Sequence, residues 1–141
     1  MDANNTSIAD ILSRINYLSE NINTFITLGI TILAELFAFF VFIKRFVPKN
    51  YTMSWILFIV GINFLTNPLA QLFYSSLKLS NLAGLYWLLT EILVVLVEAS
   101  LIYALMRQSL QKSLLYSFLL NITSIIVGAI LCWLSLLPWC Y

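Results

Sequence analysis

Four long apolar segments, separated by short polar connections, dominate the sequence. They cover residues 23–46, 53–78, 84–107 and 113–137. Each reaches the roughly 20 residues that an α-helix needs to cross a bilayer. Only 9% of the residues are charged, whereas a soluble domain usually carries about 25%. The sequence therefore predicts an all-α membrane protein with four transmembrane helices.

The connections between these segments predict how the helices are arranged. Helices joined by few residues run antiparallel, which favours an up-down-up-down bundle. Five basic residues gather in the first and third connections: Lys44, Arg45, Lys49, Arg107 and Lys112. The positive-inside rule places these two connections in the cytoplasm and both termini outside. We expect an integral protein of the plasma (inner) membrane, surrounded by the lipid bilayer.

The N-terminal segment, residues 1–22, differs from the four-helix domain of residues 23–141. It is polar and acidic, but Ile8, Ile11 and Ile15 recur at helical spacing. This pattern predicts a short amphipathic helix, either at the membrane interface or leading directly into the first span. A frayed extension of the first transmembrane helix is the alternative.

Polar residues inside the spans form one stripe on each helix. Glu91 and Glu98 lie seven residues apart in the third span, so they share one helical face. A carboxylate at this depth costs about 2.5 kcal/mol or more. The stripes of the other spans contain Thr27, Thr31 and Glu35, then Asn63, Asn67 and Gln71, then Ser117, Asn121 and Ser124. One polar stripe per helix indicates a bundle with a polar interior.

Depth brings some of these residues together. With a rise of 1.5 Å per residue, four of them lie roughly 12 to 16 Å from the basic end of their spans. They are Glu35, Asn63, Glu98 and Asn121, one from each span. Glu91 and Gln71 lie about 10 Å from the opposite end and form a second expected pair.

The buried acids need a way to be neutralised, because no lysine or arginine lies deep in any span. They can be protonated, face water, or bind a cation with help from Asn63, Asn67 and Asn121. Pro68 cannot donate a backbone hydrogen bond, so it predicts a kink and a freed carbonyl at Phe64. The alternatives are structural: an ordinary packing kink, and a protonated glutamate bonded to an asparagine amide.

The segment Asn63–Pro68 (Asn-Phe-Leu-Thr-Asn-Pro), together with Glu91-x6-Glu98, resembles a pattern in small, uncharacterised four-span bacterial membrane proteins. The resemblance covers the second and third spans and implies a fold and a cluster of interest, but no activity. Glu35 is similar in placement to the glutamate of small multidrug transporters, which also have four spans. This chain departs from those transporters in its two further acids and its orientation bias.

We therefore expect a proton- or cation-coupled transporter, or a small channel-like protein. Glu35 and Glu98 would carry the ion or proton, Asn63 and Asn121 would supply ligands together with Asn67, and Glu91 would gate or relay. The alternative is a non-catalytic membrane subunit or scaffold whose buried polar residues serve helix packing and assembly.

Other classes fit the composition poorly. The chain has no histidine, and its two cysteines, Cys132 and Cys140, do not form a CxxC pair, so we expect neither an enzyme nor a cofactor. A net charge of +1 argues against a nucleic-acid partner. We expect a homo-oligomer or a subunit of a larger membrane complex, and the sequence leaves open whether a metal binds.

Overall fold

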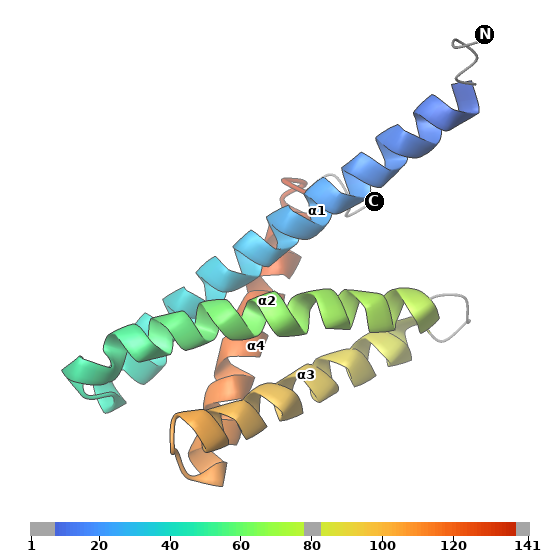
Figure 1. Cartoon of the computed structure of the whole chain (residues 1–141). Coiled ribbons are helices and arrows are strands. Elements are labelled where there is room, and N and C mark those ends of the chain that lie inside the picture. The colour runs from blue at the N-terminus through green and yellow to red at the C-terminus, as the bar shows by residue number, and fades with distance from the viewer. Residues whose placement is uncertain (1–7, 78–82, 138–141) are drawn as a thin grey trace, which may run out of the picture.

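The computed structural model describes the backbone of residues 8–77 and 83–137, and the side chains of residues 22–73 and 84–137. All regular structure in these ranges is helical (Figure 1). The four long helices are α1 (Ile8–Ala38), α2 (Thr52–Leu77), α3 (Ala83–Leu105) and α4 (Leu110–Trp133). Three short helical turns connect α1 to α2: η1 (Phe39–Ile43), η2 (Lys44–Phe46) and η3 (Lys49–Tyr51).

Among the described residues, four segments are long and apolar enough to cross a membrane, which agrees with the predicted number of spans. They are Ile22–Phe46, Lys49–Phe73, Gly84–Leu105 and Leu110–Trp133. The predicted second span, 53–78, agrees with α2, Thr52–Leu77, whereas the fourth begins before the predicted residue 113. The earlier start of α4 follows from Ser109, whose side chain accepts a hydrogen bond from the Lys112 backbone N–H at 3.5 Å.

The N-terminal segment and the first span form one continuous helix. α1 begins at Ile8 and runs without a break into the membrane-length segment that starts at Ile22. The side chains of residues 8–21 are not among those that the structure describes. The apolar stripe predicted for the N-terminal segment therefore stays a prediction, whereas its direct continuation into the first span is observed.

A π-helical turn ends the first span. In η1 the backbone hydrogen bonds join residues five apart, so the Lys44 backbone N–H donates to the carbonyl of Phe39. The chain then becomes extended at Val47, with φ −103° and ψ 124°, because the following Pro48 disfavours helical backbone in the residue before it. Lys44 Nζ also donates a hydrogen bond to Thr52 Oγ1 at the start of α2, which ties the two ends of the connection together.

The four helices contact one another in a ring. α1 packs against α2 and α4, and α3 packs against the same two helices. In Figure 1, α2 and α3 lie side by side, and α4 crosses behind α1. A ring of this kind gives every helix one face toward a shared interior, which is the arrangement that one polar stripe per helix favours.

Aromatic and aliphatic side chains fill the interior near η1. The ring of Phe39 stacks on Trp55 with centroids 5.8 Å apart, and Tyr116 meets the same Trp55 edge-on at 5.8 Å. Ile59 and Ile102 close the space between these rings, and both are fully buried. Burial of this much apolar surface stabilises the bundle and closes its interior at the end that carries the basic connections.

Candidate functional site

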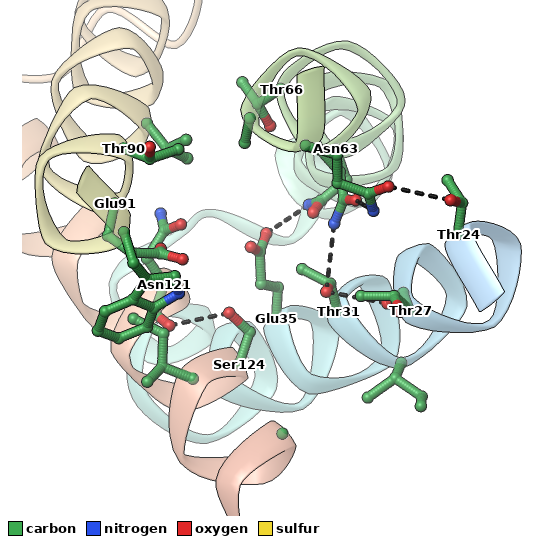
Figure 2. A pocket seen from close by; sticks show the side chains of 18 of the residues that line it. Thr24, Thr27, Thr31, Glu35, Asn63, Thr66, Thr90, Glu91, Asn121 and Ser124 are labelled. Carbon is green, nitrogen blue, oxygen red and sulfur yellow. Dashed lines mark hydrogen bonds between the residues drawn. The ribbon is translucent and has the colours of Figure 1, made fainter. Parts of the chain in front are cut away.

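A cavity of about 660 Å³ occupies the remainder of the interior and is lined by all four helices (Figure 2). Its lining includes all six polar residues predicted to form a site: Glu35, Asn63, Asn67, Glu91, Glu98 and Asn121. Burial increases along the cavity, from half-buried Thr24 and Thr27 to Glu35 at 0% exposure. The cavity therefore leads from one end of the bundle to its buried middle, and the aromatic cluster lies beyond it.

The first buried carboxyl, Glu35, meets an amide of α2. Asn63 Nδ2 donates to Glu35 Oε2 at 2.5 Å and to the Ile59 carbonyl at 3.0 Å. The second bond holds the amide in place, since it ties Asn63 to its own helix one turn back. Figure 2 shows the two side chains pointing at each other across the gap between α1 and α2.

The other oxygen of Glu35 is exceptional. Oε1 is buried and has no hydrogen-bond partner among the described residues. Buried polar atoms in folded proteins are nearly always paired, because an unpaired one costs about 1–3 kcal/mol. Glu35, which lines the inner end of the polar cavity, therefore keeps one buried acceptor unused.

The second buried carboxyl, Glu98, has partners on both oxygens. Asn121 Nδ2 donates to Oε2 at 2.5 Å, and Ser117 Oγ lies 3.4 Å from the same oxygen. Thr66 Oγ1 lies 3.2 Å from Oε1. These partners come from α2 and α4, so Glu98 joins three helices, and its side chain is 1% exposed.

The four polar residues that were predicted to lie at one depth are thus close together in the structure, with specific partners. Glu35 pairs with Asn63 and Glu98 pairs with Asn121, while Thr66 and Asn63, one turn apart on α2, link the two pairs. The second expected pair is not formed. Gln71 instead accepts from Thr24 of α1 at 3.0 Å and donates to Asn67 of its own helix at 2.8 Å, although Gln71 and Glu91 both line the cavity.

Further out, a line of hydrogen bonds follows the seam between α1 and α2. It runs from Thr24 through Gln71 to Asn67, whose Nδ2 donates to Thr31 Oγ1 at 3.4 Å. Thr24 was missed in the sequence, although it lies three residues before Thr27 on the same helical face. The seam gives the cavity a polar wall that continues to its outer end.

Glu91 and Pro68 have less defined surroundings. Glu91 lies on the cavity wall, two turns from Glu98 on the same face of α3, and is half-buried. α2 continues through Pro68 to Leu77, so the proline does not end the helix. The proline frees the backbone carbonyl of Phe64. The side chain of Phe64 is 58% exposed and lies on the outer surface of the bundle, away from the cavity.

The donor set is suited to a proton or a single cationic group. The described residues contain no cluster of three or more His, Cys, Asp or Glu side chains that could hold a metal ion. Carboxyl and amide oxygens can accept a hydrogen bond from a cation, and a carboxyl group can also bind or release a proton. The site therefore favours a monovalent ligand over a transition metal.

The chain matches no protein-family model, no curated protein and no solved structure. The resemblance to small four-span bacterial membrane proteins consequently stays a prediction. The function of the chain is therefore inferred from the cavity and the residues that line it.

Proposed function

We propose that this chain is a proton- or cation-coupled membrane transporter that uses the four-helix cavity as its binding site. The observation that supports the proposal best is Glu35 Oε1, a buried acceptor without a protein partner at the end of a polar cavity. A glutamate that serves packing alone would have both oxygens paired, because an unpaired buried atom destabilises the fold. A ligand or proton that reaches Glu35 through the cavity supplies the missing partner.

The shape of the cavity favours a transporter over an open channel. The polar lining ends at the level of Glu35 and Glu98, and buried Phe39, Trp55 and Ile59 fill the space beyond. A channel in its conducting state is open at both ends. Access from one side only, to a site near the middle of the membrane, is what alternating access requires.

The proposed orientation places the open end of the cavity outside the cell, in an up-down-up-down bundle with both termini outside. The basic connections lie at the closed end, and the positive-inside rule assigns that end to the cytoplasm of a plasma (inner) membrane. Cys132 at the open end is disulfide-bonded, and disulfides persist in oxidising compartments outside the cytoplasm. Two independent features thus support the same orientation.

The proposed coupling uses the proximity of the acids. Glu35 and Glu98 are both almost fully buried in one interior, and each ionised carboxylate there is costly. A proton or a cation at Glu35 removes one negative charge from this interior. Release on the other side of the membrane would restore the charge, so binding and charge are linked at one residue.

A non-catalytic membrane subunit is the second candidate. Hydrogen bonds from Asn63 to Glu35 and from Asn121 to Glu98 join neighbouring helices, as polar residues do in membrane assemblies. Large apolar side chains such as Leu33 and Trp133 also remain exposed and can contact lipid, a second copy of the chain or a partner subunit. This candidate predicts effects on stability and assembly but none on flux.

The test is ion flux in liposomes that contain the purified protein and a trapped pH-sensitive dye. We expect an imposed gradient of a monovalent cation (sodium, potassium or an organic ammonium) to change the internal pH with wild type and not with Glu35→Gln. Ser100→Ala is the control, because Ser100 is exposed on α3 and its hydroxyl bonds only to the Leu96 carbonyl. Equal flux in Glu35→Gln and wild type would refute the transporter. No flux in either protein, with lower thermal stability in Glu35→Gln, would favour the subunit.

A further inference from the structure

Building on the proposed transporter, we propose that the cavity binds an organic cation bearing an N–H donor, an ammonium or a guanidinium, whose charged group bonds to Glu35. The inference concerns the class of substrate and divides the roles of the two buried acids. Glu35 is the residue that touches the ligand, and Glu98 is a positioning residue held within the protein.

The charge of the lining selects cations. The ionisable side chains on the cavity wall include Glu35, Glu91 and Glu98, and no lysine or arginine belongs to the described lining. A cavity whose ionisable side chains are all acids becomes negative when any of them loses its proton, and low-dielectric walls strengthen that potential. An anion is therefore repelled, and a cation is attracted toward the deepest acid.

The free oxygen of Glu35 selects a hydrogen-bond donor. Oε1 is an acceptor without a partner, whereas Oε2 is already occupied by Asn63. A charged N–H group satisfies both needs at this oxygen, since it supplies a donor and a compensating charge. A quaternary ammonium supplies the charge alone and leaves the acceptor unpaired.

Glu98 is engaged by the protein on both sides. Thr66 Oγ1 lies 3.0 Å from the Ile62 carbonyl, and Ser117 Oγ lies 2.9 Å from the Val95 carbonyl. If Thr66 gives its one proton to the Ile62 carbonyl, its hydroxyl oxygen can accept a hydrogen bond from a protonated Glu98 Oε1, while Oε2 accepts from Asn121. Both oxygens of Glu98 thus have protein partners, whereas Oε1 of Glu35 has none among the described residues.

The size and composition of the cavity favour an organic molecule over a bare metal ion. A volume of about 660 Å³ lies in the range of small-molecule sites, roughly 300–1,000 Å³. Hard metal ions such as calcium need six to eight oxygen ligands, and Glu35 offers one free oxygen. Trp87, Val94 and Ile125 also line the cavity and can hold the apolar part of a ligand.

Two glycines provide a matched pair of variants. A Cβ atom added at Gly128 or at Gly61 meets no atom within 4 Å, so neither position is sterically crowded. Gly128 lines the cavity, whereas Gly61 is exposed and belongs to no part of its lining. Gly128→Leu therefore reduces the space for a ligand, and Gly61→Leu is the same change outside the cavity.

The experiment is isothermal titration calorimetry of the full chain in phosphatidylcholine nanodiscs with three probes of similar shape. They are phenylbutylammonium, its trimethylated analogue phenylbutyltrimethylammonium, and the uncharged phenylbutanol. We expect phenylbutylammonium to bind at least about tenfold more tightly than either analogue. Glu35→Gln and Gly128→Leu should weaken it by about tenfold or more, while Gly61→Leu should stay within about threefold of wild type. Thermal unfolding of every variant verifies that it is folded.

Three results would overturn the proposal: equal affinity for phenylbutylammonium and phenylbutanol, wild-type affinity in Glu35→Gln, or no binding of any cation probe. The liposome assay separates this failure from failure of the transporter itself. If flux depends on Glu35 but no probe binds, the substrate class is wrong and the transporter stands. If flux and binding are both absent, neither proposal survives.

Discussion

Glu35 and Glu98 are chemically identical side chains at nearly the same depth, and their surroundings give them different properties. Asparagine donates to one oxygen of each, but only Glu98 has polar neighbours around its second oxygen. The sequence predicted both acids and both asparagines at one level. It could not predict which carboxyl would be incompletely bonded, because that depends on how α1 and α3 are rotated relative to Thr66.

At the residue scale, Glu98→Gln is expected to be tolerated. The amide Nε2 can donate to Thr66 as a protonated carboxyl would, and the amide oxygen can accept from Asn121. Glu98→Ala removes both bonds and leaves Asn121 Nδ2 without its carboxyl partner, so it should cost about 2–5 kcal/mol. Thermal unfolding in detergent measures the difference. Equal destabilisation by the two variants would contradict the neutral, internally bonded Glu98 described above.

At the scale of the elements, sequence patterns predicted the helices far better than the way they end. Hydropathy and length predicted four spans, and the observed segments match them in number and approximate position. The π-turn η1 was not predicted, because nothing in Phe39–Ile43 distinguishes five apolar residues in a π-turn from five in an α-helix. The early start of α4 likewise depends on the cap at Ser109, a local hydrogen bond that hydropathy does not detect.

The π-turn leads to a prediction about deletions. A π-helical turn, with hydrogen bonds between residues five apart, contains one residue more than an α-helical turn. Removal of exposed Phe40 can therefore convert η1 into regular α-helix. Removal of Leu57, equally exposed but within α2, rotates the following residues by roughly 100° and moves Asn63 away from Glu35. We expect the Phe40 deletion to retain most of its thermal stability and the Leu57 deletion to lose much of it. Equal loss in both would show that η1 does not absorb an extra residue.

At the scale of the whole molecule, the polar stripes of four helices meet in one cavity that is closed at one end. Each stripe was visible in the sequence, because polar residues recur at steps of three and four within apolar spans. The closed end was not, because it arises from Phe39, Trp55 and Tyr116, aromatic residues on three different elements. Only their packing in the folded chain shows that the cavity stops at the glutamates.

Labelling with a membrane-impermeant maleimide tests this arrangement in cells. Thr27→Cys, on the half-buried cavity wall, should react with reagent added outside, and Ile59→Cys, fully buried below the acids, should react from neither side. The parent protein provides the background, since its Cys132 is disulfide-bonded. Reaction of Thr27→Cys only from the cytoplasmic side would reverse the proposed orientation, and reaction of Ile59→Cys would show that the cavity is not closed.

The most direct measurement is infrared difference spectroscopy of the protein in lipid, comparing wild type with Glu35→Gln and Glu98→Gln across pH. The account predicts a protonated carboxyl band that is absent in Glu35→Gln and that diminishes when phenylbutylammonium is added, because a bound cation replaces the proton on Glu35. A second band, absent in Glu98→Gln, should not respond to the cation. The titratable neighbours of Glu35 across the cavity are Glu91 and Glu98 of α3, while α2 and α4 present Asn63, Thr66 and Asn121. A Glu35 band that neither pH nor cation changes would contradict an exchangeable site and leave this carboxyl a structural element of the bundle.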